Sequence, residues 1–230
     1  MSSTRLPGKV MADLVGAPMI TRQIERLSRS ALIDRIVLAT STDPSDDPLA
    51  ACVRALGLGA YRGSLDDVLG RFIGALGAFG PADHVVRLTG DCPLADPVVI
   101  DQTIALHLER GTDYASNTPA RRTFPKGLDV EVVRAPCLIR GGHAAKDPYE
   151  REHVTPYFYR HPEQFPQVFL SQAAQEGDVR WTVDRPDDLE FMRAVYGALY
   201  PTTPDFTSDQ VRALVRARPE LAMLGGERRI

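Results

Sequence analysis

The amino-acid sequence predicts an α/β domain in which helices cover both faces of a mostly parallel sheet. Short apolar runs typical of buried strands alternate with longer segments whose apolar residues recur at helical spacing. The 230 residues contain no internal repeat, no low-complexity tract and no linker rich in glycine and serine. One compact domain over residues 1–230 is therefore the expected organisation.

The first half of the chain alternates regularly between helices and strands. Pro18 precedes apolar residues at Met19, Ile20, Ile24 and Leu27, and this spacing predicts an amphipathic helix over residues 18–30. The other elements expected in this half are a strand at 34–40, helices at 46–56 and 64–79, a strand at 83–88 and a helix at 96–108.

The second half is less regular. The expected elements are strands at 113–116, 128–133 and 179–183, an aromatic-rich helical segment at 149–165, and helices at 186–200 and 207–216. In parallel α/β sheets, ligands bind at the carboxyl ends of the strands. Polar residues that directly follow a predicted strand are therefore the first candidates for chemistry.

Composition excludes several classes of protein. The chain has 27 basic and 30 acidic side chains, a net charge of -3, and 43% hydrophobic residues, which is ordinary for a globular protein and lacks the basic excess of a nucleic-acid binder. No apolar run is long enough to cross a bilayer. Three cysteines without paired spacing argue against a disulfide framework, and five histidines show no metal-ligand spacing. We expect a cytoplasmic protein without nucleic-acid or membrane partners.

The N-terminal loop is the first candidate site. Ser2, Ser3, Thr4, Arg5 and Lys9 supply three hydroxyls and two cations beside a flexible glycine, an inventory that suits a polyphosphate. The spacing differs from the G-x-x-x-x-G-K-[ST] phosphate loop, so an NTPase is not indicated. On composition alone, a frayed polar terminus is the more frequent explanation.

Two aspartates at predicted strand ends are the second candidate. Asp91 follows the strand at 83–88 within TGDCPLADP, and Asp184 follows the strand at 179–183 within WTVDRPDDLE. Singly, each is more often a turn former or helix cap. At one edge of a sheet, both could bind a magnesium ion together with phosphate oxygens and water. Asp187 and Asp188 fall in a first helical turn and are assigned a structural role.

The third candidate is the segment GLDVEV, where Asp129 and Glu131 share one face of a predicted strand. This pattern fits either a solvated acidic face or carboxylates that accept hydrogen bonds from sugar hydroxyls. Nearby, Glu152 and His153 lie in REHVTPY, where a helix start is the simpler interpretation and a substrate or subunit contact is the alternative.

Taken together, five ordered motifs resemble the cytidylyltransferase family that makes CMP-activated sugar acids. They are STRLPGK, TGDCPLADP, GLDVEV, REHVTPY and WTVDRPDDLE. The likeness is greatest to the spore coat polysaccharide biosynthesis branch, which is homologous to CMP-Kdo synthetase and acylneuraminate cytidylyltransferase. It extends from residue 2 to about residue 200, and five motifs in order are far more specific than any one of them.

The resemblance implies a Rossmann-like nucleotidyltransferase fold of the glycosyltransferase-A type, with three layers and usually a homodimer. It assigns the nucleotide to about residues 1–110, the sugar and the dimer contact to about 111–203, and a C-terminal helix to 204–230. Ser2 to Arg5 and Lys9 would hold the phosphates of CTP, and Asp91 and Asp184 would hold magnesium. The residues expected near the nucleotide are Arg62, Ser64 and Arg71, and those expected to face the sugar are Asp129, Glu131, Glu152 and His153.

The implied reaction is attack by a substrate hydroxyl on the α-phosphorus of CTP, with release of pyrophosphate. A glycosyltransferase of similar fold is an alternative, but no D-x-D element follows an apolar strand here. A non-catalytic nucleotide-binding homologue is a further alternative. Family members carry an apolar strand before the phosphate loop, whereas this sequence starts at the loop. The lack of that strand is what suggests the non-catalytic alternative. Such an absence would leave neighbouring strand edges unpaired.

Overall fold

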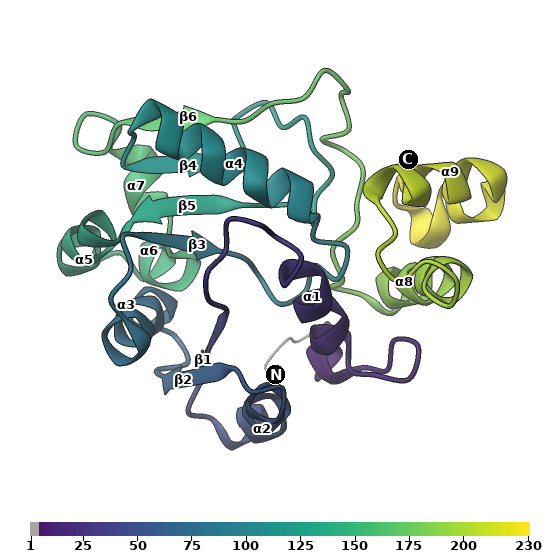
Figure 1. Ribbon diagram of the computed structural model, residues 1–230, viewed down its shortest axis with the longest axis horizontal. Coiled ribbons are helices and arrows are strands. Elements are labelled where there is room, and N and C mark those ends of the chain that lie inside the picture. Colours follow the sequence, from purple (N-terminus) through teal and green to yellow (C-terminus); the bar gives the residue numbers. More distant parts are fainter. Residues whose placement is uncertain (1–4) are drawn as a thin grey trace.

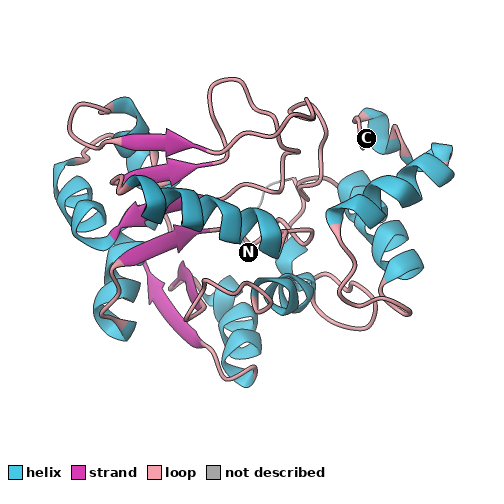
Figure 2. Cartoon of the chain, turned by 45° about the horizontal axis from the view of Figure 1, so that its top comes forward, coloured by secondary structure: helices cyan, strands magenta, loops and turns pink. Residues whose placement is uncertain are grey.

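A computed structural model describes residues 5–230 as alternating strands and helices, which confirms the α/β class (Figures 1 and 2). The strands are β1 (Val37–Ser41), β2 (Gly59–Gly63), β3 (His84–Arg87), β4 (Tyr114–Ser116), β5 (Glu131–Arg134) and β6 (Gln167–Phe169). The α-helices are α1 (Met19–Leu27), α2 (Asp47–Ala55), α3 (Val68–Phe79), α4 (Pro97–Arg110), α5 (Ala135–Ala144), α6 (Pro148–His153), α7 (Pro156–Arg160), α8 (Pro186–Leu199) and α9 (Ser208–Ala217). Four short 3-10 helices complete the set: η1 (Lys9–Met11), η2 (Pro44–Asp46), η3 (Pro219–Leu221) and η4 (Leu224–Gly226).

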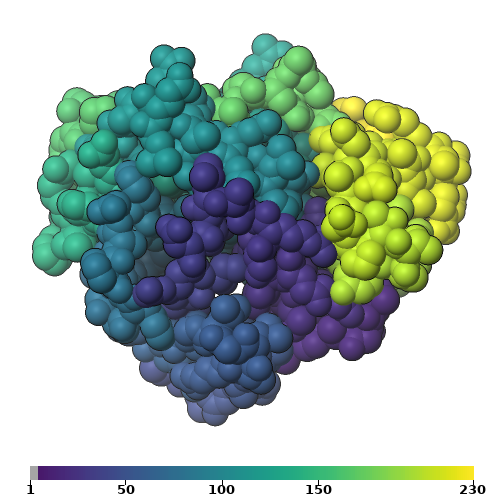
Figure 3. Space-filling model, in the orientation of Figure 1, coloured from purple at the N-terminus to yellow at the C-terminus, as the bar shows by residue number. Residues whose placement is uncertain are grey.

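The strands form two sheets. β1 and β2 are parallel, with Val37 opposite Gly59. The larger sheet has the order β3-β5-β4-β6, in which β5 runs antiparallel to both neighbours and β4 and β6 are parallel. Within the described residues, no β-pairing joins β1 to β3. The space-filling view shows a narrow opening where the purple N-terminal residues meet the blue residues around α2 (Figure 3).

The side chains of the central strands β4 and β5 point alternately to the two faces of the sheet, and helices cover both faces, so the fold has three layers. Ala115 and Val132 point to one face and pack against α4, which crosses that face in Figure 1. Their neighbours Tyr114 and Val133 point to the opposite face and pack with α5 and α7. A separate apolar cluster around Trp181 joins α8 and α9 to the N-terminal segment. Within residues 5–230, no helix is both long and apolar enough to span a membrane.

Most sequence-predicted elements are confirmed, and five differences, the helix α5 among them, have local causes. The strand β2 was not predicted, because its sequence GAYRG begins and ends with glycine, which is uncommon in strands. The strand β6 was not predicted either, because its three residues are too few to show a pattern. The expected helical segment at 149–165 divides into α6 and α7 because Val154 adopts a φ of 71°. The expected strand at 179–183 is wrong as a strand, because only Arg180 makes a β-bridge, to Lys126.

The helix α5 was missed because its sequence APCLIRGGHA contains a Gly-Gly pair that resembles a turn. Packing explains both glycines. A Cβ on Gly141 would lie 2.5 Å from the Phe158 ring, and one on Gly142 would lie 2.1 Å from Ile73. The two glycines therefore let α3 and α7 approach the backbone of α5 closely.

The half-buried His84 and the buried His107 form a pair that links β3 to α4. His84 Nδ1 lies 2.9 Å from His107 Nε2, the two rings meet edge to face, and Thr112 Oγ1 lies 3.4 Å from His107 Nδ1. Burial is the main cause that lowers the pKa of His107 to about 4, and electrostatic repulsion from His84 and Arg134 contributes to this shift. The pair is therefore held neutral at physiological pH.

This pair predicts acid sensitivity. The folded-state pKa of His107 lies below its unfolded value of about 6.5, so the unfolded chain binds more protons below that pH. The pair's stabilisation should be complete above about pH 6.5 and should fall, by up to about 3 kcal/mol, as the pH approaches 4. Urea unfolding of the wild type and of His107→Gln at pH 7.5 and pH 5 measures this. Equal losses in both proteins would contradict it.

Candidate active site

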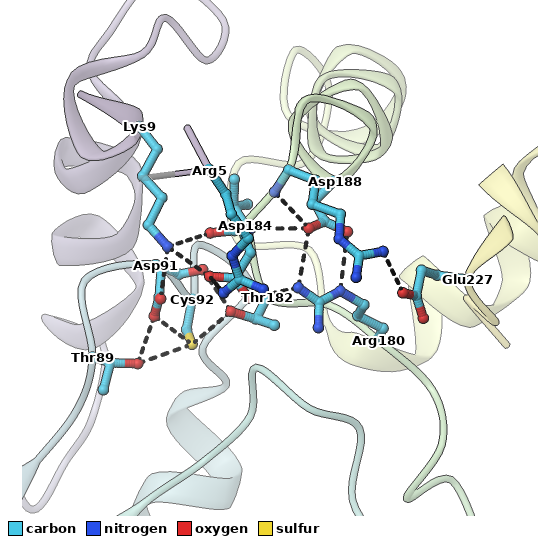
Figure 4. A network of polar contacts seen from close by, with 12 residues as sticks. Arg5, Lys9, Thr89, Asp91, Cys92, Arg180, Thr182, Asp184, Asp188 and Glu227 are labelled. Carbon is cyan, nitrogen blue, oxygen red and sulfur yellow. Dashed lines mark hydrogen bonds and ion pairs between the residues drawn. The ribbon is translucent and has the colours of Figure 1, made fainter. Parts of the chain in front are cut away.

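Three segments that are far apart in the sequence meet at one point (Figure 4). Asp91 lies in the loop after β3, Asp184 lies in the loop before α8, and Lys9 begins η1. The Lys9 ammonium lies 2.9 Å from Asp91 Oδ2 and 3.0 Å from Asp184 Oδ1. The N–H of Val183 donates to the carbonyl of Asp91 at 2.9 Å, which joins the two acidic loops. The predicted carboxylates therefore converge on one cation.

Lys9 is a largely buried cation. Its side chain is 12% exposed, and Nζ also donates to the Val183 carbonyl at 2.6 Å. Burial alone would lower the pKa of the ammonium, but the charges and acceptors of Asp91 and Asp184 outweigh burial, and the pKa of Lys9 is raised. Lys9 is therefore charged at neutral pH.

Asp184 is surrounded by cations. Its Oδ1 lies 3.1 Å from Arg5 Nη2 as well as 3.0 Å from Lys9, and its Oδ2 accepts from Arg180 Nη2 at 2.6 Å. Burial would raise the pKa of this carboxyl, but the hydrogen bonds from Lys9 and Arg180 outweigh burial, so the pKa of Asp184 is lowered. Asp184 is therefore ionised at neutral pH.

Asp91 is fixed by its neighbours in the loop. Thr89 Oγ1 donates to Asp91 Oδ1 at 2.7 Å, and the buried Cys92 thiol lies 3.5 Å from the same oxygen. Burial, with the charge of Asp91 adding to it, raises the pKa of Cys92 well above its usual value. Cys92 is therefore a neutral thiol that packs beside the carboxylate rather than a nucleophile.

The chemistry of this donor set fits a hard divalent cation. Asp91 and Asp184 already hold one shared positive group, the Lys9 ammonium, between their oxygens. Magnesium is usually bound in proteins by one or two carboxylates, with substrate phosphates and water completing the shell. Within residues 5–230, no cluster of three or more acidic, His or Cys side chains could hold a metal by itself.

Asp188 organises the loop that carries Asp184, although the sequence suggested only a helix-start role for it. Asp188 Oδ2 accepts the backbone N–H groups of Asp184 and Arg185, each at 2.9 Å. Its carboxylate also accepts two hydrogen bonds of 3.1 Å from Arg180 and one of 2.8 Å from Arg229. Burial opposes ionisation, but these donors outweigh it and lower the pKa of Asp188 to about 2.

A polar pocket of about 220 Å³ adjoins the acidic pair through Thr89, which both lines the pocket and donates to Asp91. The sequence-predicted residues Asp129, Glu131 and His153 also line it. Its remaining lining residues are Arg87, Thr118, Arg122, Tyr149, Thr155, Pro156 and Tyr159.

The charges of this pocket are paired. The carboxylate of Asp129 accepts hydrogen bonds from both terminal nitrogens of Arg122, one of them with a length of 3.0 Å. Glu131 Oε2 accepts from Arg87, while its Oε1 accepts from the Tyr114 hydroxyl at 2.8 Å. Glu131 is thus buried behind Arg87 and orients it, whereas Asp129 is more open to the pocket.

The remaining expected nucleotide contacts lie elsewhere. Arg62 donates to the carbonyls of Ser41 and Asp43, at 2.8 and 2.9 Å, and so holds the loop after β1. Arg71 packs against Gly63, and its buried Nε has no partner among the described residues. Ser64 is exposed. The expected contacts of Ser2, Ser3 and Thr4 fall outside the described residues.

Glu152 and His153 separate in space. His153 lines the pocket and its ring lies 4.3 Å from the ring of Tyr149, whereas Glu152 is exposed and does not line the pocket. A larger cavity of about 740 Å³ lies between α4 and α9, and none of the sequence-predicted site residues lines it.

Sequence reasoning missed Arg87, Thr89, Arg122, Arg180 and Asp188. Thr89 could have been found, because it lies between a strand and a candidate metal ligand. The arginines carry no such signal, since they are common in this chain and their partners are distant in sequence.

The fold is that of an α/β nucleotidyltransferase. The chain belongs to the cytidylyltransferase family, whose model matches residues 1–214. It is 34% identical over 230 residues to the spore coat polysaccharide biosynthesis protein SpsF of Bacillus subtilis, covering 96% of this chain and 93% of that protein. It is 38% identical over 143 residues to the 3-deoxy-manno-octulosonate cytidylyltransferase of Geobacter sulfurreducens, covering 61% of this chain and 55% of that enzyme.

Solved structures agree with this assignment. A cytidylyltransferase from Leptospira borgpetersenii superposes with a TM-score of 0.89 at 28% identity, covering 96% of this chain and 92% of that one. A CMP:2-keto-3-deoxy-manno-octonic acid synthetase complexed with CTP superposes with a TM-score of 0.63 at 19% identity, covering 85% and 94%, which supports the fold alone.

The buried Glu131 predicts a stability effect. Glu131→Gln keeps the shape but presents an amide group to Arg87 or to the donors Tyr114 and Thr155, so one buried partner loses its hydrogen bond. We expect a loss of about 1–3 kcal/mol in the free energy of unfolding, measured in urea. The exposed Glu152→Gln is the matched control and should change it by less than about 0.5 kcal/mol. Equal stability of the two variants would refute the buried role.

Proposed function

We propose that this chain transfers CMP from CTP to a hydroxyl group of a sugar or sugar acid, with release of pyrophosphate, in surface polysaccharide or glycoconjugate synthesis. Family membership supports the reaction class. The observation that carries the proposal is the convergence of Asp91, Asp184 and Lys9 beside a pocket that begins at Thr89. Nucleotidyl transfer depends mainly on alignment and charge neutralisation, and this arrangement offers both.

Arg5 and Lys9 would bind the phosphates. The side chain of Arg5 is 58% exposed, so its guanidinium can turn from Asp184 to an incoming triphosphate. Lys9 would follow the same anion, because phosphate oxygens offer an ammonium charged acceptors as the two carboxylates do. Both cations would then stabilise the leaving pyrophosphate and release the two carboxylates from their internal ion pairs.

Asp91 and Asp184 would hold Mg²⁺. The ion, when bound, would neutralise charge on the α-phosphate and lower the pKa of the attacking hydroxyl. Thr89 keeps Asp91 oriented at 2.7 Å, and Arg180 does the same for Asp184 at 2.6 Å. Neither carboxylate therefore has to reorganise during the reaction.

The 220 Å³ pocket would hold the acceptor. Asp129 and Arg122 offer an acceptor and a donor to sugar hydroxyls, and Tyr149 and Tyr159 offer aromatic faces for the ring. Glu131 would act indirectly by holding Arg87. His153 would close one side of the pocket, and Glu152 would lie outside it.

The rest of the proposal follows the family resemblance. Ser2 to Thr4 would contact the triphosphate, Arg71 and Ser64 would approach the nucleotide, and Arg62 would support the loop beside them. Residues 1–110 would serve mainly the nucleotide and residues 111–203 mainly the sugar, with a C-terminal segment at 204–230. We further propose a homodimer that works in the cytoplasm.

Activity tests the proposal directly. The protein, with CTP and Mg²⁺, should release pyrophosphate in the presence of at least one member of a panel of sugars and sugar acids. Asp91→Asn should abolish turnover and keep the fold, as measured by circular dichroism, because the amide removes a charge that the metal requires. Near-normal activity of Asp91→Asn would remove the metal-ligand assignment. No pyrophosphate with any acceptor would count against the transferase.

Lys9→Met tests the exchange of cations at the acidic pair. Without Lys9, Asp91 loses its ion pair with that ammonium, and Asp184 keeps Arg5 and Arg180. The melting temperature should therefore fall without metal and recover more than that of the wild type when millimolar Mg²⁺ is added. The KM for CTP should rise about tenfold or more, in line with losing a charged hydrogen bond. Lys146→Met, at an exposed lysine, is the matched control. If Mg²⁺ raised the melting temperature of Lys9→Met no more than that of the wild type, the replacement of Lys9 by a metal ion would be refuted.

A further inference from the structure

Arg229 is buried deeply for a charged residue so close to the end of the chain. Its side chain is 0% exposed. Its guanidinium donates to Asp188 Oδ1 at 2.8 Å and to the carbonyls of Arg180 and Leu224 at 2.9 and 3.1 Å. The carbonyl of Arg229 accepts from the indole N–H of Trp181 at 2.9 Å. A buried guanidinium needs such a full set of acceptors, so its position is tightly defined.

The segment around Arg229 lies against the loop that carries Asp184. The N–H of Arg180 donates to the carbonyl of Arg228 at 2.8 Å, and Arg185 forms an ion pair of 2.9 Å with Glu227. Figure 4 shows Glu227, Arg180 and Asp188 on the side of Asp184 that faces away from Lys9. The family model ends at residue 214, so this segment lies beyond the matched region.

The contacts run from Arg229 to Asp184 by two routes. Asp188 accepts the backbone N–H of Asp184 at 2.9 Å and so fixes the backbone. Asp188 also holds the guanidinium of Arg180, which in turn donates to Asp184 Oδ2 at 2.6 Å and fixes the side chain. Both of these routes pass through Asp188, and Arg229 also donates directly to the carbonyl of Arg180 at 2.9 Å. Among residues 5–230, Arg229 is the one hydrogen-bond partner of Asp188 from outside its own loop and helix.

We infer that Arg229 is a positioning residue for the carboxylate of Asp184, acting through Asp188 and Arg180; the inference rests on the proposed role of Asp184 as a metal ligand. Two arginines and two aspartates balance their charges in this network. Without Arg229, Asp188 draws Arg180 toward itself and Asp184 loses a restraint. Outer contacts of this kind commonly change metal affinity or activity by about 10–100-fold.

The test compares Arg229→Met with Arg228→Met. Arg228 is adjacent, but its side chain is 46% exposed and pairs with Asp178 at the surface. We expect Arg229→Met to lower kcat and the affinity for Mn²⁺, measured by titration calorimetry with a non-hydrolysable CTP analogue, by about 10–100-fold. The KM for the acceptor should stay within about twofold, and Arg228→Met should match the wild type. All measurements are made below the melting temperature of each variant.

Hydrogen exchange supplies a readout that needs neither metal nor turnover. The N–H groups of Asp184 and Arg185 donate to Asp188, so their exchange should accelerate in Arg229→Met and stay unchanged in Arg228→Met. Unchanged exchange, kcat and Mn²⁺ affinity in folded Arg229→Met would overturn the inference and leave Arg229 a stabilising residue only.

Two outcomes need separate variants. Where Arg229→Met does not fold, three variants replace it: Arg229→Lys, Asp188→Asn and the double variant Asp188→Asn/Arg229→Lys. The double variant should bind Mn²⁺ as tightly as Asp188→Asn does. Losses of affinity that add up in the double variant would overturn the inference. Where the wild type binds Mn²⁺ no more tightly than Asp91→Asn does, the proposed metal site fails, and the inference fails with it.

Discussion

The ammonium of Lys9 between Asp91 and Asp184 is the interaction on which the site depends. Two carboxylates this close together repel each other unless a cation lies between them. Lys9 supplies that cation from a segment 82 residues away from one acid and 175 away from the other. The internal cation keeps the two acids together, and a metal ion at the proposed site would have to take over this role from the ammonium.

Two separate parts of the fold bring these groups together. The strand β3 of the four-stranded sheet ends at Arg87, and the following loop presents Asp91 with Thr89 beside it. Asp184 belongs to the C-terminal cluster around Trp181, so its position is defined by α8 and not by a strand. Hydrogen bonds from the Val183 N–H to the Asp91 carbonyl and from the Tyr196 hydroxyl to the Pro93 carbonyl join the two parts, which makes the site an interface within one chain.

The sequence predicted the acids better than their surroundings. Asp91 and Asp184 could be identified because each follows an apolar run and belongs to a specific motif. The run before Asp184 predicts a strand because Trp181 and Val183 alternate with polar residues, and both side chains are fully buried. Their backbone groups pair with single residues in different segments instead, namely Lys126 and Asp91. Periodicity reports burial, but it does not report which backbone a residue pairs with.

The burial of Arg229 also bears on the order in which the site is completed during synthesis. Asp184 emerges from the ribosome well before residue 229, and until then Asp188 lacks one of its charged partners. The loop after β3 can present Asp91 without residue 229, whereas the loop that carries Asp184 gains the second guanidinium bound by Asp188 only when residue 229 is in place. The sheet thus defines the first carboxylate early in the chain, whereas the second is defined only once residues on both sides of α8 and α9 have met.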